Sequence, residues 1–263
     1  MFQLKSLIAA IILFSAASLA HSQEEINFTD EKGLKQGRWI KKFENGNILY
    51  EGTFKDDKPL GEFKRYYISG KAISVLNHYQ DSDSADASFF YPNGYLAAKG
   101  LYTGKNKTGV WRFYSEEKKE VLICEESYSN NLKQGKSTKF HLNGNKAEEI
   151  NYMNDLKHGE WLQYYANAIL CIKSAYKNGR LDGSFESFFA NGSKEISGSY
   201  QKGVRTGNWN FYDENGSLRK TINYINGRPT NDNELIKQET EYLDMLEKNG
   251  GKIEDPAKTG IIW

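Results

Sequence analysis

The chain has 263 residues, with 35 Lys and Arg against 34 Asp and Glu, which gives a formal net charge of +1. This balance excludes the dense positive charge that phosphate backbones attract, so we expect no nucleic acid as a partner. The 17 Tyr, 14 Phe, 5 Trp and 24 Gly favour short twisted strands that bury aromatic rings and are joined by tight turns.

Residues 1–22 have the anatomy of a secretory signal peptide. Lys5 supplies a positive flank, an apolar run follows from Leu7 to Leu19, and cleavage is expected after Ala20 or Ser22. The run is too short to be a good membrane span, so we expect no stable span after cleavage. The sequence therefore predicts a bacterial protein that is exported to the periplasm or the extracellular space.

Residues 23–230 are organised by an internal repeat. Glycines recur every 24 residues, with one step of 26, and Ala85 stands at the one position where the glycine is replaced. The leading glycines are Gly37, Gly61, Gly109, Gly135, Gly159, Gly183 and Gly207. A fixed period of this length predicts eight stacked units, each burying its apolar side chains against its neighbours.

Aromatic residues occupy fixed places within each unit. Two residues after the leading glycine stand Trp39, Phe63, Trp111, Trp161, Phe185 and Trp209, with Ala87 and Ser137 in the other two units. Five residues after it stand Tyr66, Phe90, Tyr114, Phe140, Tyr164, Phe188 and Tyr212. Seven residues before the next glycine stand Phe54, His78, Tyr102, Tyr128, Tyr152, Tyr176 and Tyr200, and Tyr224 continues this column.

Asn-Gly pairs such as Asn45-Gly46 and Asn93-Gly94 lie between the aromatic runs. Both residues of such a pair tolerate positive φ, so each unit is predicted to be a β-hairpin. Eight hairpins give an all-β array, one elongated twisted antiparallel sheet on the order of 75 Å long at about 4.8 Å per strand. Pro59 and Pro92 are expected in turns.

The two aromatic columns that follow each glycine have opposite parity along a strand. Either both faces of the sheet carry aromatic rings or a bulge intervenes, and the sequence leaves this open. The third unit begins with the polar segment 81–86, which we expect to fray or loop. The fourth unit is two residues longer, and an insertion of two is tolerable in a strand or its turn because it preserves parity.

Residues 231–263 are expected to form a helix and a tail. Asn231 and Glu234 form a helix start, and Asn249-Gly250 form a stop. The apolar residues of one helical face are Leu235, Ile236, Tyr242, Leu243 and Leu246. We expect this helix to cap the last hairpin, because exposed sheet ends invite pairing with other chains.

No catalytic or metal-binding pattern stands out. Cys124 and Cys171 lie on equivalent strands two units apart, about 19 Å, which is too far for a disulfide. The four histidines show no pair at ligand spacing. We therefore expect no metal, no cofactor and no enzymatic activity.

The pattern Gly-x-Trp-x-x-Tyr-Tyr-x-x-Asn-Gly-x-Leu followed by Tyr-x-x-Gly-x-x-x-Gly resembles the MORN repeat. It is closest to the variant found in bacterial proteins labelled as toxin/antitoxin-type antitoxins. Residues 159–170 and 200–209 carry the resemblance most clearly, and it covers residues 33 to about 228. It implies chains of hairpins used as interaction scaffolds. Choline-binding and glucan-binding repeats are also similar, but their contiguous aromatic triplets and shorter period fit less well.

Two functions are compatible with these sequence features. The first is a non-enzymatic scaffold that binds another protein or an envelope component along its extended sheet. The second is a glycan- or cell-wall-binding module that uses exposed rings as stacking platforms, with Tyr66, Tyr114, Tyr164 and Tyr212 as candidates. The two differ in the expected exposure of those four rings.

Overall fold

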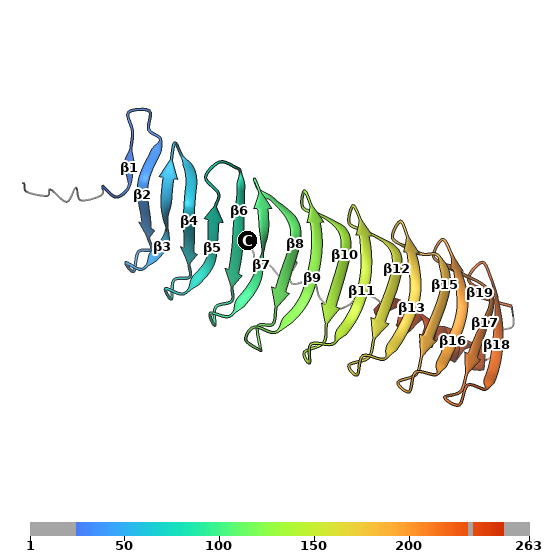
Figure 1. Ribbon diagram of the computed structural model, residues 1–263. Helices are drawn as coiled ribbons and strands as arrows, with labels where there is room; N and C mark the ends of the chain where they lie inside the picture. Colours follow the sequence, from blue (N-terminus) through green and yellow to red (C-terminus); the bar gives the residue numbers. More distant parts are fainter. Residues whose placement is uncertain (1–24, 231–233, 250–263) are drawn as a thin grey trace, which may run out of the picture.

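The structure is a computed structural model that describes residues 25–230 and 234–249. The expected signal peptide, residue Asn231 and the tail lie outside the described residues. Nineteen strands form one open antiparallel sheet, and each hairpin pairs with the next. Figure 1 shows the hairpins side by side in an elongated twisted array, with the helix behind its C-terminal end. The all-β repeat prediction and the capping helix are confirmed.

Each unit contributes one outgoing and one returning strand. The outgoing strands are β2 (Lys35–Lys42), β4 (Lys58–Tyr66), β6 (Ser84–Phe90), β8 (Asn106–Tyr114), β10 (Leu132–Phe140), β12 (Leu156–Tyr164), β15 (Gly183–Phe188) and β17 (Val204–Tyr212). The returning strands are β3 (Ile48–Lys55), β5 (Ala72–His78), β7 (Leu96–Thr103), β9 (Leu122–Ser129), β11 (Lys146–Met153), β13 (Leu170–Lys177), β16 (Lys194–Gln201) and β18 (Leu218–Ile225). Short strands β1 (Phe28–Thr29), β14 (Arg180–Leu181) and β19 (Arg228–Pro229) and the helix α1 (Glu234–Asn249) complete the fold.

The leading glycines lie at β-bulges. All seven have positive φ, from 65° at Gly37 to 108° at Gly183. At Gly61, the pairing with β3 shifts register between Gly52 and Thr53, because the outgoing strand carries extra residues there. Glycine is needed because a side chain at this φ is strained. In the third unit, β5 and β6 pair with no shift, which explains why Ala85 can replace the glycine.

The Asn-Gly pairs do not form the turn that the sequence suggested. In the loop of Asn45-Gly46, only the glycine has positive φ, and its N–H donates to Phe43 O at 3.0 Å. Asn45 instead accepts a hydrogen bond through Oδ1 from Asn47 N at 3.1 Å. The loop is therefore a type I turn followed by a left-handed glycine, a common three-residue hairpin.

The two-residue turns with positive φ at both positions join one unit to the next. Asp56 and Asp57 have φ of 52° and 65°, and Asn178-Gly179 follows the same pattern. These mirror-image turns match the right-handed twist of the flanking strands, so they suit tight connections. The repeat thus alternates two kinds of turn along the two long edges of the sheet.

Three local expectations need correction or refinement. Pro59 lies inside β4 beside the turn, rather than in the turn, where a missing N–H is tolerated. The segment 81–86 does not fray throughout, because β6 begins at Ser84 and Ala85 is buried. The extra residues of the fourth unit lie in the loop between β8 and β9, as parity allowed. Cys124 and Cys171 do not form a disulfide with each other, as predicted, and Cys171 is only half-buried.

The buried side chains form two apolar clusters on one face of the sheet. One cluster runs from Ala87 to Tyr128, and the other runs from Ile150 to Tyr224 and includes Ile236 and Leu243 of α1. Between them, strands β9 to β11 bury polar groups, including Glu126, Ser137, Lys139 and Glu148. The aromatic core is therefore interrupted once, near the middle of the array.

Candidate functional site

The sheet has two chemically different faces. We call the face that carries the first aromatic column the tryptophan face, and its Trp111, Trp161 and Trp209 are each 0% exposed. The opposite face carries the second column, and we call it the tyrosine face. Both faces therefore carry aromatic rings, and the bulges lie elsewhere, at the leading glycines and in the returning strands.

The four tyrosines predicted as stacking platforms lie on the tyrosine face but are not fully exposed. Tyr66, Tyr164 and Tyr212 are half-buried, and Tyr114 is buried at 8% exposure. Tyr66 Oη donates to Glu51 at 2.6 Å, and Tyr164 Oη donates to the carboxylate of Glu149 at 2.9 Å. Each of these bonds joins one hairpin to its neighbour, so these tyrosines stabilise the array as well as form its surface.

These hydrogen bonds shift the pKa values of the tyrosines and of the carboxylates. Burial and the hydrogen bond to a carboxylate raise the pKa of Tyr66 and of Tyr164 to about 12. Burial alone favours the neutral form of Glu149, but hydrogen bonds from Lys136, Lys146 and Tyr164 outweigh it and hold the pKa of this carboxyl at about 2. The face therefore keeps its charge pattern over the physiological pH range.

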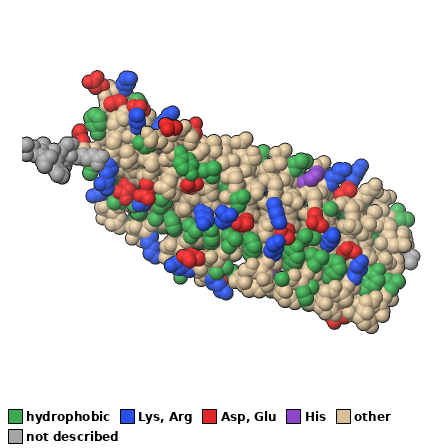
Figure 2. Space-filling view, in the orientation of Figure 1, with side chains coloured by type: hydrophobic (Ala, Val, Ile, Leu, Met, Phe, Trp, Pro, Cys, Tyr) green, Lys and Arg blue, Asp and Glu red, His purple; other side chains and the backbone are tan. Residues whose placement is uncertain are grey.

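Ion pairs accompany the tyrosines along the same face. Arg112 Nε lies 2.6 Å from Glu125, and Lys194 Nζ lies 2.6 Å from Glu186. Figure 2 views this side of the molecule and shows hydrophobic, basic and acidic side chains mixed along its length. A long surface of aromatic rings and paired charges is suited to recognition of another polypeptide.

The tryptophan face carries a row of cations that the sequence motifs did not reveal. Each cation lies two residues before a leading glycine and is placed over aromatic rings. The row consists of Lys35, Lys107, Lys133, Lys157 and Arg205. Lys107 Nζ lies 5.0 Å from the Trp111 ring centroid and 5.1 Å from that of Tyr128. The sequence does indicate this row, since the five cations share one position in the repeat, two residues before the leading glycine.

Two carboxylates are buried beside this row. Glu126 is 1% exposed and accepts from Lys133 at 2.6 Å and from Tyr128 Oη at 2.5 Å. Glu148 lies 3.0 Å from Lys139 and accepts from Trp161 Nε1 at 2.8 Å. Buried charges are stable only when they are paired and hydrogen-bonded in this way.

The helix α1 covers the last units of the tryptophan face. Leu243 is 0% exposed within the apolar cluster, and Arg205 lies 2.6 Å from Asp244 and 2.5 Å from Glu247. Burial and the nearby charges of Glu148 and Glu247 raise the pKa of Tyr176 in β13. The C-terminal end of α1 therefore points toward β13, away from the last hairpin.

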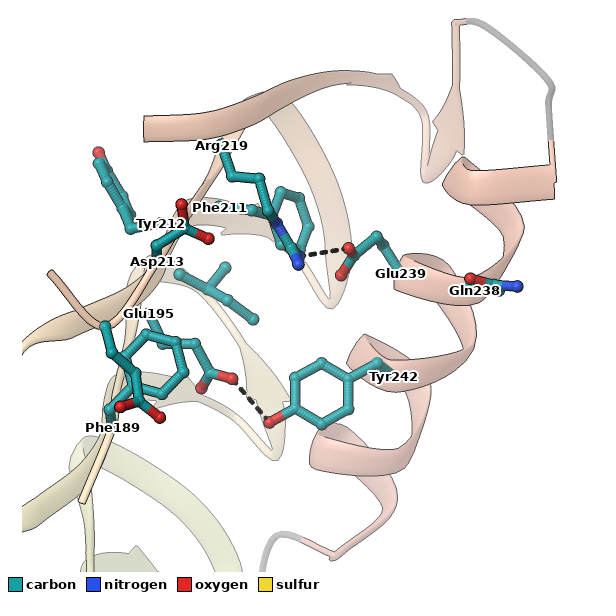
Figure 3. A pocket seen from close by; sticks show the side chains of 11 residues that line it. Phe189, Glu195, Phe211, Tyr212, Asp213, Arg219, Gln238, Glu239 and Tyr242 are labelled. Atoms are coloured by element: carbon teal, nitrogen blue, oxygen red, sulfur yellow. Dashed lines mark hydrogen bonds and ion pairs between the residues drawn. The ribbon is translucent and has the colours of Figure 1, made fainter. Parts of the chain in front are cut away.

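A groove of about 440 Å³ separates α1 from the end of the sheet. Figure 3 shows it bridged by two contacts, Glu239 with Arg219 and Tyr242 with Glu195. Arg219, the one basic residue among those that line this groove, is paired with Glu239. We interpret it as part of the docking surface of α1.

A second groove lies on the same face over β3–β7. It has a volume of about 410 Å³ and is lined mainly by apolar side chains. They include Phe54, Phe63, Leu76, Phe89 and Tyr102, and the basic lining residues are Arg65, His78 and Lys105. Burial lowers the pKa of His78, so this side chain is neutral near pH 7.

Within residues 25–230 and 234–249, no three His, Cys, Asp or Glu side chains gather as a metal site would require. No helix in this described part is long and apolar enough to cross a membrane.

Comparison with known proteins identifies the repeat. Residues 35–56, 133–154 and 205–226 match a family model described as the MORN repeat variant. These stretches correspond to the first, fifth and eighth hairpins, so the matches extend from one end of the array to the other. No curated protein matches the chain at a significant level.

Proposed function

Because the chain is a MORN-repeat protein, we propose that it serves as a non-enzymatic scaffold that binds another protein along its tyrosine face. MORN repeats are binding modules for proteins or membranes, and the uncovered length of this face is the observation that supports a protein partner. It extends over all eight hairpins, while the tryptophan face is occupied by the aromatic core and by α1. Such a surface is far larger than a small ligand requires.

The composition of the face favours a protein over a glycan. Sugar stacking needs rings whose flat sides are open, whereas Tyr66, Tyr114, Tyr164 and Tyr212 are half-buried or buried. Tyrosine and arginine beside paired charges are the residues that dominate protein interfaces. A glycan-binding module that uses these rings remains the alternative, and soluble cell-wall fragments that bind and quench tyrosine fluorescence would support it.

The first experiment compares charge reversals on and off the tyrosine face. The chain is immobilised and exposed to envelope extract, and the captured protein is identified and quantified. Arg112→Glu removes the pair with Glu125 at the centre of the face, so capture should fall at least tenfold. Lys177→Glu changes an exposed residue at the edge and should leave capture unchanged. Equal capture by both variants would contradict the proposal.

We also propose that the chain acts outside the cytoplasm, on the basis of the signal-like segment 1–22. Cell fractionation and N-terminal sequencing should find a chain that begins near His21 or Gln23 in the envelope or the medium. An uncleaved chain in the cytoplasm would contradict this. Export would separate the protein from a cytoplasmic toxin, so the proposal does not include an antitoxin activity.

A further inference from the structure

The row of cations on the tryptophan face continues beyond the end of α1. At Arg205, the row meets carboxylates that α1 supplies, Asp244 and Glu247. The next cation toward the N-terminus is Lys157, two hairpins away because Leu181 stands in the unit between, and Lys133 and Lys107 follow at intervals of one hairpin. Two strand spacings of about 4.8 Å place cations of adjacent hairpins about 10 Å apart. Beyond Lys107 lies the apolar groove over β3–β7.

The segment that follows α1 has matching chemistry in the same order. Residues 250–263 contain Glu254 and Asp255 first, and then Ile261, Ile262 and Trp263. An extended chain advances about 3.3 Å per residue, so the acidic pair comes about 16–20 Å after Asn249 and Trp263 about 46 Å after it. Glu247, near the end of α1, contacts Tyr200 of β16 and lies near Tyr176 of β13. From there, 16–20 Å is about four strand spacings and reaches the lysine row at β12 and β10, and 46 Å reaches the groove near β5 and β6.

We infer that residues 250–263 dock on the tryptophan face of their own chain. Glu254 and Asp255 pair with the lysines of the row, and Ile261, Ile262 and Trp263 enter the groove that Phe54, Phe89 and Tyr102 line. The segment thereby extends the cover that α1 begins. This inference goes beyond the proposed function, because it assigns a segment of the same chain to the tryptophan face and leaves the tyrosine face to a partner.

Two observations favour this occupant over a separate molecule. The charged residues that line the groove, Arg65 and Lys105, are both basic, so its rim suits an acidic chain. The segment is also tethered beside the row, because Glu247, two residues before the end of α1, already contacts Arg205. A short tether gives an effective concentration in the millimolar range, which a free partner rarely reaches.

Zero-length carbodiimide cross-linking of the full chain tests the acidic half of this inference. The reagent joins a carboxylate to a lysine amine when the two are in contact. We expect amide links from Glu254 or Asp255 to Lys107, Lys133 or Lys157. The pair Glu239 and Lys220, 3.1 Å apart, is the positive control, and Lys173 on the tyrosine face should not link to the segment.

Isotopic mixing separates the segment's own face from that of a second copy. When labelled and unlabelled chains are combined, the expected links join peptides of the same label. Links between labels would show docking on another molecule and overturn the inference. So would the loss of every link from residues 250–263 while the Glu239–Lys220 link still forms.

The apolar half is tested by the reactivity of His78 toward diethylpyrocarbonate, measured by mass spectrometry. Replacing Ile261→Ser together with Trp263→Ser should open the groove and speed modification of His78 several-fold. Thr259→Ser is the matched control, and His141 at the opposite edge of the sheet should react at the same rate in all three chains. An unchanged rate at His78 would contradict docking. Partner capture by Arg112→Glu and wild type is independent of this result.

Discussion

At the level of single residues, the core is matched in size across neighbouring hairpins. Opposite three of the large rings, the preceding returning strand carries a glycine: a Cβ added at Gly52, Gly100 or Gly198 would overlap the ring of Phe63, Trp111 or Trp209. Where the ring is missing, the opposite residue is large, as Leu76 is opposite Ala87. The departures of the third and fifth units are therefore compensated, since Glu126 likewise lies opposite Ser137.

A double-mutant cycle tests this compensation. Ala87→Trp alone overpacks the contact with Leu76, and Leu76→Gly alone leaves a cavity, so each should destabilise the fold by about 1–3 kcal/mol or more. Together they recreate the arrangement of Gly100 and Trp111, so the double variant should be more stable than the sum by about 1–3 kcal/mol. Urea unfolding measures this coupling. Ala87→Trp combined with the distant Ser174→Gly should show none.

Among the residues that the structure describes, Ala168 is the one alanine with positive φ, at 67°, and it stands where the Asn-Gly loops have glycine. The left-handed conformation costs alanine about 1 kcal/mol more than glycine. Ala168→Gly should therefore raise the free energy of unfolding by about that amount. Ala190→Gly, in the next loop but without positive φ, should lower it by about 0.5–1 kcal/mol. Stabilisation by both substitutions would refute the explanation.

The depressed pKa of Glu149 predicts an acid-sensitive contribution to stability. A carboxyl whose pKa falls from 4.5 unfolded to about 2 folded stabilises the protein above pH 4.5 and loses this contribution as the pH falls toward 2. The loss should be about 2–3 kcal/mol at low salt. Glu149→Gln should flatten the decline, as measured by urea unfolding at pH 2.5 to 6. Glu160→Gln, at an exposed pair with Lys173, should retain it.

At the level of elements, α1 is a cover held by both apolar and charged contacts. Leu243 of α1 is buried against the last part of the aromatic core, and Arg205 forms ion pairs with Asp244 and Glu247 of the helix. Without this cover, Trp209 and Tyr224 would meet water at the end of the array. An end unit of a repeat protein generally needs such a cap.

Leu243→Ala should destabilise the last hairpins by about 2–5 kcal/mol, because it empties a fully buried site. Met245 on the same helix is 44% exposed, so Met245→Ala should change the free energy of unfolding by no more than about 0.5 kcal/mol. Hydrogen exchange resolves the position of the effect. Faster exchange should be confined to β15–β18, since contacts in a repeat array are between neighbours. Equal effects of both substitutions would contradict the assigned packing.

At the level of the whole molecule, the array depends on keeping the period. Each hairpin contacts only its neighbours, and the pairing of Ile150 with Trp161 would be kept if one period after Trp161 were removed. Hydrogen bonds that join neighbouring hairpins also repeat with the unit. Tyr67 Oη donates to Phe90 O at 3.0 Å, and Tyr165 Oη donates to Phe188 O at 2.8 Å. The molecule should therefore tolerate the loss of one whole period.

Deleting residues 162–185 removes one 24-residue period within a strand and should give a folded chain about 10 Å shorter. Deleting residues 162–184 leaves one residue more in the strand, which reverses the faces of the side chains that follow. This second chain should lose cooperative unfolding. Circular dichroism and small-angle scattering compare the two, and equal folding would contradict the importance of parity.

The sequence by itself determined the repeat, the eight hairpins, the loop positions, the aromatic columns and the C-terminal end of α1. These features depend on local propensity and on a period that neighbouring residues display directly. The tertiary structure decided how the faces are built. The bulges at the leading glycines, the exchange of turn types and the size match of Leu76 with Ala87 depend on pairing between strands. So does the cation row, because Lys107 and the ring of Tyr128 meet only when adjacent hairpins pair.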